Sequence, residues 1–489
     1  MALGIGYGLP FVAQHGTNPY KTQWAAALEG AKGAGATVED ENAGTGSCLV
    51  SRGQDVYTDG LPSTPSLLIV PQFYKAGNLY QDVPPFVAED STMRFTVSRN
   101  TTATRVNSSG LIASVASGVP RIDWLGQSCP ALLVEASGQN LALQSAGFQV
   151  SGTWSPTNIT VTTGSTAAFT APDGSTDADL LTATASGSAR IIQSFSFVSG
   201  TTYTYSAFAK AGSGFFGLTM ENGGVASGAA VIWNLNTGAL AVSGVAGTGY
   251  TLQSQGIENY GNGWYRCRMT VLLSVSIAGN IRANTSDGTM SSAIINSASG
   301  NNVYVWGAQL EAGSNATTYI PTTSGTGSRA ADVISASGAL VSGLIGQTEG
   351  TIYAEVDIRN LTTADFARII SIRATADSNN FIEIEKRSST QLRISARLNS
   401  GTGITFLTHP SAFVLGTNKI AFAYQDGNYA MGFNGVVATS AQAGMAVGLS
   451  QVILGAASSN IAQLNDRIRA AALYTTRLSN DQLAELTRL

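Results

Sequence analysis

Histidine and charged residues are scarce in this chain, and each shortage excludes a class of function. The 489 residues include two histidines, His15 and His409, too few for a histidine-based metal site or catalytic triad. Charged residues make up only 11 % and the formal net charge is −4, so there is no polybasic face and we expect no nucleic-acid partner. No apolar run reaches the ~18 residues of a membrane span, so we expect no membrane insertion.

Cysteine is equally sparse. Cys48, Cys129 and Cys267 lie far apart, form no Cys-x-x-Cys pair, and leave one thiol over from any disulfide, so we expect three buried free thiols. No P-loop, dinucleotide fingerprint or Gly-x-Ser-x-Gly elbow is present, so we predict no catalytic residue, no metal and no cofactor. The N-terminus lacks the basic start and apolar core of a signal peptide, so we expect export by another route, such as release at lysis.

Glycine and apolar residues, in contrast, are plentiful. The chain has 55 glycines and an apolar fraction of 44 %, which is enough for folded cores. Its length predicts about three domains of ~150 residues. The alternating runs predict a mainly β fold, with an N-terminal anchor containing one short helix, a small scaffold module and two tandem antiparallel β-sandwiches of the jelly-roll type.

Residues 61–140 predict a compact module with few strands. A short buried strand at residues 67–70 is closed by Pro71, and three further segments follow in order, at residues 99–112, 120–124 and 129–135. Their letters, RNTTATRVNSSGLI, PRIDW and CPALLVE, together with the LLIV strand, resemble a module shared by many tailed-phage structural proteins. Asn100 departs from the small residue usual at its position in that family. The resemblance implies a phage protein in which this module is a scaffold.

Residues 141–322 contain about nine strand-like runs at the spacing of a β-sandwich. The final run carries Trp306 and leads into Tyr319-Ile320-Pro321 and a linker of Thr, Ser and Gly, so we interpret it as the closing strand and its tether. Trp306, like Trp233 and Trp264, lies within an alternating strand and is expected in the core. With its Trp-x-Pro-x-Asn opening at Trp154 and its acidic stretch at residues 171–179, the block resembles carbohydrate-binding-module-like jelly-roll domains.

Residues 323–489 predict a second sandwich. Asp426-Gly427 supplies a tight hairpin turn, and Ser479 is a suitable N-cap for a short C-terminal helix. The ending at residues 467–483, R-I-R-x-x-A-L-Y-x-x-R-L-S-x-x-Q-L, resembles concanavalin-A-like (laminin-G-like) lectin domains, and this implies a lectin-like fold without identifying a ligand.

Residues 1–60 differ from the rest of the chain. An apolar, glycine-rich arm precedes a short amphipathic helix that begins after Pro19, and Tyr20, Trp24 and Leu28 are its anchor candidates. A helix this short is marginal by itself. It either packs on its own domain or inserts into a virion socket or a trimer axis, and we predict the anchor.

Two features offer alternatives to a purely structural role. Glu383 and Glu385 share one strand face about 7 Å apart, a spacing compatible with a glycosidase, although Lys386 and Arg387 follow directly and favour a solvated strand face. Asp173, Asp177 and Asp179 form the densest acidic loop, in which calcium is conceivable but is not our prediction.

Sugar recognition by sandwich modules relies on exposed aromatic rings. The candidates for carbohydrate binding are Trp154, Tyr260, Tyr424 and Tyr429, each of which has plain packing as its alternative.

Together these features predict a non-enzymatic virion protein of a tailed phage, a tail fibre or spike assembled in the host cytoplasm. Residues 1–60 are expected to attach it to a tail or capsid socket, as a homotrimer, and residues 141–322 and 323–489 to present β-sandwiches to a host-surface glycan. A head fibre or capsid decoration protein is the first alternative and a glycan depolymerase acting through Glu383 the lesser one. A non-viral secreted lectin also remains open, and the phage-like segments argue against it.

Overall fold

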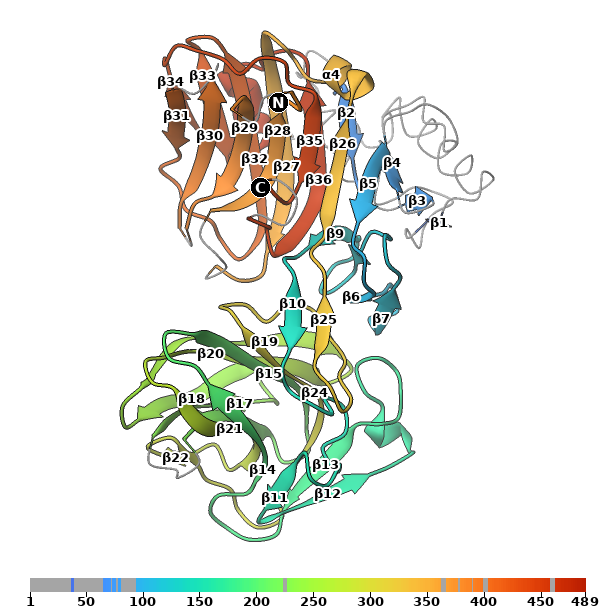
Figure 1. Ribbon diagram of the computed structural model, residues 1–489, viewed down its shortest axis with the longest axis vertical. Helices are drawn as coiled ribbons and strands as arrows, with labels where there is room; N and C mark the ends of the chain where they lie inside the picture. The colour runs from blue at the N-terminus through green and yellow to red at the C-terminus, as the bar shows by residue number, and fades with distance from the viewer. Residues whose placement is uncertain are drawn as a thin grey trace, which may run out of the picture.

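The computed structural model describes residues 37–38, 65–71, 73–75, 78–80, 94–222, 227–361, 366–376, 379–388, 390–398, 403–457 and 462–489. Within these ranges the protein is almost entirely antiparallel β-structure with two short α-helices, which confirms the mainly β prediction. Two β-sandwiches lie end to end, and two short strands, β10 (Gly138–Asn140) and β25 (Gly327–Arg329), connect them as a stalk (Figure 1). We call the one that contains the C-terminus the base sandwich and the other the inserted sandwich.

The inserted sandwich packs two six-stranded sheets around one apolar core. The first sheet, in spatial order, is β11 (Ser155–Thr157), β14 (Arg190–Phe197), β21 (Ile277–Ser286), β16 (Phe215–Glu221), β17 (Gly228–Asn234) and β18 (Ala239–Ala246). The second is β12 (Ile159–Thr163), β13 (Asp179–Ala183), β24 (Asn302–Ala312), β15 (Thr202–Ala211), β20 (Trp264–Leu273) and β19 (Tyr250–Gly261). The minor elements are the 3₁₀ turn η1 (Ala167–Phe169) and the hairpin of β22 (Met290–Ser291) and β23 (Ile294–Ile295).

The base sandwich is larger. Its ten-stranded sheet runs β1 (Thr37–Val38), β3 (Phe73–Lys75), β4 (Asn78–Tyr80), β5 (Arg94–Ser98), β26 (Val333–Ser337), β35 (Gln451–Leu454), β28 (Ala367–Arg373), β29 (Phe381–Lys386), β30 (Leu392–Leu398) and β31 (Gly403–Thr408). The eight-stranded sheet runs β34 (Val436–Ser440), β33 (Tyr429–Phe433), β32 (Gly416–Gln425), β27 (Glu349–Ile358), β36 (Asp466–Tyr474), β9 (Ala131–Val134) and β8 (Ile122–Asp123), and β2 (Leu67–Ile69) also pairs with β36. A hairpin of β6 (Ala103–Val106) and β7 (Ile112–Val115) completes this region.

The sheets divide the chain differently from the predicted boundaries. Strands from the expected scaffold module at residues 61–140 complete the sheets of the expected C-terminal sandwich at residues 323–489. Val97 of β5 pairs with Ile334 of β26, and Leu132 of β9 pairs with Ile468 of β36. The base sandwich is therefore discontinuous in sequence, and the inserted sandwich interrupts it. Strand partners so distant in sequence leave no periodic signal from which to predict them.

Local turn and cap signals are confirmed. Strands β32 and β33 form the hairpin around Asp426-Gly427, with Gly427 at a positive φ of 69°. Helix α5 (Asn480–Leu486) begins with a capping box between Ser479 and Gln482. No such signal precedes α4 (Ala339–Leu344), which follows Gly338 without a side-chain cap.

The predicted core tryptophans, Trp233, Trp264 and Trp306, are all buried. The cysteine prediction is confirmed at Cys267, a buried free thiol, and wrong at Cys129, which is disulfide-bonded. Cys48 and the anchor candidates Tyr20, Trp24 and Leu28 lie outside the described residues. No helix within the described ranges has the length and hydropathy to cross a membrane.

Candidate functional site

The stalk alone is a weak connection between the sandwiches. Its two strands share three residue pairs, from Gly138 with Arg329 to Asn140 with Gly327. A two-stranded ribbon is marginally stable in water without further packing. The placement of the inserted sandwich therefore depends on contacts at the root of the stalk.

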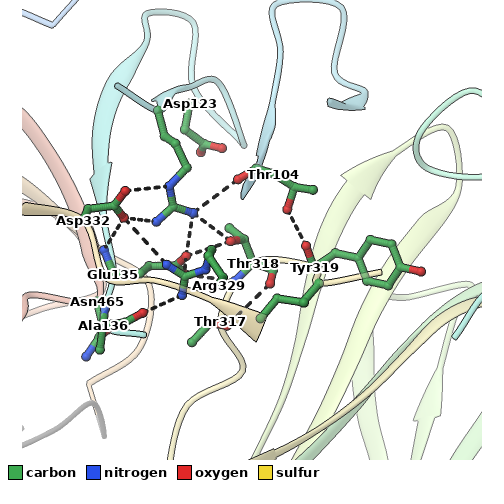
Figure 2. A network of polar contacts seen from close by, with 12 residues as sticks. Thr104, Asp123, Glu135, Ala136, Thr317, Thr318, Tyr319, Arg329, Asp332 and Asn465 are labelled. Atoms are coloured by element: carbon green, nitrogen blue, oxygen red, sulfur yellow. Dashed lines mark hydrogen bonds and ion pairs between the residues drawn. The ribbon is translucent and has the colours of Figure 1, made fainter. Parts of the chain in front are cut away.

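A buried ion network holds this root (Figure 2). Arg121, just before β8, is fully enclosed by protein and pairs with both Glu135 and Asp332, at 2.6 Å from Nη1 to Glu135 Oε2. Arg329 contacts the same Glu135 oxygen at 3.3 Å, and Arg99 pairs with Asp332 at 2.8 Å. We call these five residues the stalk-root network. They come from both sides of the insertion and join the two crossings of the chain.

The network also holds the tether of the inserted sandwich. The backbone N–H of Thr318 donates to Glu135 at 2.9 Å, and the Thr318 hydroxyl donates to the other carboxylate oxygen at 2.7 Å. The hydroxyl of Thr104 donates to the carbonyl of Tyr319 at 2.6 Å (Figure 2). The Tyr319 ring packs on Trp306, with 4.4 Å between the ring centroids. The start of the predicted tether, at Thr318 and Tyr319, is therefore held by the stalk root on one side and by the inserted sandwich on the other.

Arg121 and Glu135 of the stalk-root network stay charged at ordinary pH. Burial acts to lower the pKa of Arg121, but Asp332 and Glu135 beside it raise that pKa above its usual value. Burial acts to raise the pKa of Glu135, yet Arg329 and Arg121 hold it well below its usual range. Removing one partner would leave a buried charge uncompensated, which is strongly destabilising.

Beside this network a cleft of about 940 Å³ lies between the two sandwiches. One wall comes from β19 and β20 of the inserted sandwich. The facing wall comes from the end of β27 and the starts of β32 and β36 of the base sandwich, and Glu135 and Thr318 of the stalk root also line the cleft. The volume falls within the ~300–1,000 Å³ of ligand pockets. A space of this size between two rigid units is a candidate binding site.

Strand alternation places two arginines in the inserted wall. Cys267 of β20 points into the core, so its neighbours Arg266 and Arg268 point to the opposite face, which lines the cleft. On β19, Glu258 stands opposite Arg266 and Gly256 stands opposite Arg268. Arg266 donates from Nη2 to the Ser206 hydroxyl at 3.1 Å.

The base wall carries charges that are paired among themselves. Arg359 contacts Asp357 at 2.5 Å through Nε and reaches Glu258 of the inserted sandwich at 3.6 Å through Nη1. The remaining arginines of this wall pair as follows: Arg467 with Asp123 at 2.6 Å and Arg469 with Glu355 at 3.0 Å. Arg359 therefore bridges the two sandwiches, while the other two arginines belong to the base alone.

Two charged groups in the cleft depart from this pairing. Burial raises the pKa of Asp466 to about 8, although Arg467 lies 3.9 Å away and the Arg359 N–H donates to Asp466 at 3.0 Å. Arg268 is half-buried, and no described residue forms a hydrogen bond or ion pair with it. Burial lowers the pKa of its guanidinium. The cleft thus contains a carboxyl group that resists ionisation and a cation without a partner among the described residues.

The four aromatic residues predicted to bind sugar are buried. Trp154, Tyr260, Tyr424 and Tyr429 each expose at most 9 % of their surface. Trp154 packs on Phe148 with ring centroids 4.8 Å apart, and the Tyr424 hydroxyl donates to the Gly346 carbonyl at 2.9 Å. Their prediction as exposed sugar platforms is wrong, because a sequence period separates the two faces of a strand without showing whether the outer face is covered.

Tyr260 alone among them lines the cleft. Its ring stands edge-on to Phe208, with 4.8 Å between the ring centroids, and burial raises the pKa of its hydroxyl. It is therefore part of the wall and offers no open ring face for stacking.

Glu383 and Glu385 do not lie on a solvated strand face as expected. Both are buried, and Arg368 contacts Glu383 at 2.5 Å and Glu385 at 2.7 Å. Arg393 contacts Glu385 as well. The two glutamates expected in water are therefore held in a buried ion cluster with arginines of the neighbouring strands β28 and β30.

The acidic loop is held by hydrogen bonds from other parts of the inserted sandwich. Asp177 accepts from the indole N–H of Trp306 at 3.0 Å, and Asp179 accepts from the Phe148 N–H at 2.8 Å. Burial raises the pKa of Asp179 to about 7. The described residues contain no group of three or more potential metal-ligating side chains.

Comparisons with known proteins give no family. The chain matches no family model, and it matches no curated protein sequence. Its matches among solved structures are distant and partial. The Ruminococcus gnavus IT-sialidase CBM40 bound to α2,3-sialyllactose is 17 % identical, covering 31 % of this chain and 88 % of that one, with a TM-score of 0.27.

Two further structures show the same level of likeness. The K499G mutant of NanB sialidase from Streptococcus pneumoniae is 14 % identical, over 30 % of this chain and 25 % of that one, with a TM-score of 0.26. The SAP-like pentraxin from Limulus polyphemus is 13 % identical, over 28 % and 69 %, with a TM-score of 0.24. Similarity this low carries no argument about a ligand.

Proposed function

We propose that this protein is a non-enzymatic attachment protein that holds a surface glycan in the cleft between its two sandwiches. The observation that supports this proposal is the cleft itself, which is large, open between two rigid units and lined largely by polar side chains. Side-chain amides such as those of Gln255, Asn259 and Asn315 supply the donors and acceptors that sugar hydroxyl groups require. A single site of this kind binds weakly, so display as a homotrimer would raise the avidity.

The proposed location is the virion of a tailed phage, where a tail fibre or spike would be attached through residues 1–60. Support comes from the four ordered segments between residues 67 and 135 that resemble phage structural proteins. Their polar residues Arg99, Arg121 and Glu135 belong to the stalk-root network. A module that mounts an inserted domain suits a scaffold that carries a binding unit away from a particle.

Glycan binding is tested with the full chain on host cells and on their isolated surface polysaccharide. We expect saturable binding to both and no shortening of the polysaccharide. A Gly256→Leu variant would direct a side chain at the Arg268 guanidinium, 2.7 Å from the position of a Cβ, and is expected to abolish binding. Gly343→Leu, at a glycine with open space around it, is the matched control. Absence of binding by the folded wild type would favour the alternative, a head fibre or capsid decoration protein.

A glycan depolymerase is the lesser alternative, and Asp466 favours it. A buried carboxyl group whose pKa is raised to about 8 can serve as a general acid in a cleft. Glycoside hydrolysis also needs a second carboxylate, and the neighbouring Glu258 and Asp357 are both paired with Arg359. Polysaccharide cleavage by the wild type that is lost in Asp466→Asn would establish this alternative.

A further inference from the structure

The arginines of the cleft are not all paired. Among the described residues that line it there are five arginines, Arg266, Arg268, Arg359, Arg467 and Arg469, and four carboxylates, Glu135, Glu258, Asp357 and Asp466. Every one of these carboxylates has an arginine nitrogen within 3.9 Å. Arg467 and Arg469 are paired in addition with Asp123 and Glu355 of the base sandwich.

The arginine without a partner among the described residues is Arg268. Of the five arginines it alone forms neither an ion pair nor a hydrogen bond with a described residue, and its Nη1 is buried without a partner. Its charged surroundings are Glu258 and Asp466, which favour the cation, and Arg266, which opposes it. Both acids have other partners, Arg359 and Arg467. A guanidinium in this position can gain a partner from a ligand, since none of the described residues supplies one.

The strand beneath Arg268 is shaped to receive this side chain. Gly256 pairs with Arg268 across β19 and β20, and a Cβ at position 256 would lie 2.7 Å from Nη2. A glycine within a strand weakens the strand and is typical of places where another group approaches the backbone closely. The guanidinium lies over this glycine in the wall of the cleft. No aromatic ring or carboxylate of the described residues forms a direct contact with it.

We propose that the cleft selects acidic over neutral saccharides, and that Arg268 binds the sugar carboxylate. This inference rests on the glycan-binding function proposed above and specifies its ligand class. A planar guanidinium matches a carboxylate through two parallel hydrogen bonds, and its fixed geometry gives specificity as well as affinity. Arg266, two residues away on the same face, adds a second positive charge beside the bound group.

The test uses the full chain on an array of uronic-acid, sulfated, phosphorylated and neutral oligosaccharides, including uronic acids whose carboxyl groups have been reduced to alcohols. We expect binding to uronic-acid oligosaccharides, loss of binding after reduction, and a decrease in affinity of about 10-fold to 100-fold in Arg268→Gln. Arg268→Lys keeps the positive charge but lacks the planar guanidinium, so its affinity should lie between those of the wild type and Arg268→Gln. Arg190→Gln is the matched control, since Arg190 is also half-buried in the inserted sandwich but lies on the other sheet.

The outcomes separate the inference from the function on which it rests. Equal binding to uronic acids and their reduced forms, or full binding by Arg268→Gln, overturns the inference and leaves glycan binding in place. Binding confined to sulfated or phosphorylated sugars overturns the carboxylate as the recognised group. No binding to any oligosaccharide by the folded protein overturns both proposals.

Discussion

The stalk root and the cleft are neighbours that use arginine in different ways. Glu135 and Thr318 belong to both regions. At the stalk root, Arg121 has two buried carboxylate partners and Arg329 shares one of them. In the cleft, Arg268 has no partner among the described residues. Paired charges suit a rigid connection between two domains, whereas a cation without a protein partner in a cleft suits reversible binding of an anionic ligand.

Charged residues of the segments at residues 99–112, 120–124 and 129–135 are paired in the same way as the rest of the stalk root. Arg99, Arg121 and Glu135 belong to the stalk-root network, and Asp123 pairs with Arg467 of the base sandwich. None of these four residues is the unpaired group of the cleft. They therefore help to hold the stalk root and the base sandwich together.

The largest expected effect comes from breaking the stalk root with Arg121→Met. This change leaves Glu135 with Arg329 alone and removes one of the partners of Asp332, so we expect a loss of about 3–5 kcal/mol in the free energy of unfolding. Calorimetry measures it, because two sandwiches can unfold in separate transitions. Arg190→Met is the control, with an expected loss below about 1 kcal/mol. Equal losses in the two variants would show that the network does not hold the base together.

The second effect concerns Asp466 and pH. Its folded pKa of about 8 lies above its ordinary value of 3.8, so its contribution to stability is complete below 3.8 and is lost as the pH rises through about 8. Asp466→Asn removes this titration, and we expect its melting temperature to fall less across that interval than that of the wild type. Melting curves at several pH values test this, and parallel pH profiles of the two proteins would contradict it.

The pKa of Glu135 is shifted in the opposite direction to that of Asp466, so its effect on stability has the opposite dependence on pH. Its pKa is held below its ordinary value of 4.5, so the stability that it contributes is present above that value and is lost as the pH falls through the folded pKa. Glu135→Gln should therefore flatten the acid limb of the stability profile, where Asp466→Asn should leave it unchanged. The same melting curves, extended to acid pH, compare the two variants.

Arg268→Gln should have a much smaller effect on stability. Because it removes a half-buried charge that has no partner among the described residues, we expect the free energy of unfolding to stay constant or to rise by up to about 1 kcal/mol. Chemical denaturation measures the change. A loss as large as that of Arg121→Met would mean that Arg268 is a structural residue and not a binding residue.

The smallest expected effect is that of Glu258→Gln. Its contact with Arg359 is long, at 3.6 Å, and both side chains are about one-third exposed, so the loss in stability should be below about 1 kcal/mol. The change also removes a negative charge near Arg268, which should strengthen binding of uronic-acid oligosaccharides. Weaker binding by this variant would contradict the proposed role of Arg268 in binding the sugar carboxylate.

The sequence could predict those parts of the fold that depend on neighbouring residues. The hairpin at Asp426-Gly427 and the cap at Ser479 follow from local turn chemistry. The burial of Trp233 in the core between the two sheets follows from strand alternation. The pairing of β5 and β9 with strands beyond residue 332 could not be predicted, because the residue pattern of a strand does not indicate which distant strand it pairs with.

The site was harder to predict than the fold. The alternation of Arg266 and Arg268 around Cys267 places both arginines on the outer face of β20, which is a signal that the sequence contains. That this face meets the base sandwich depends on the insertion and on the stalk root. The buried Trp154 and Glu383 show a related limit, because strand alternation does not indicate that Phe148 packs on Trp154 or that Arg368 pairs with Glu383.

Binding and stability measured on one sample of Arg268→Gln test whether Arg268 is a binding residue. We predict that the melting temperature equals or exceeds that of the wild type while the affinity for uronic-acid oligosaccharides falls at least about 10-fold. Affinity that is unchanged in a folded variant, or affinity that is lost together with the fold, would contradict it.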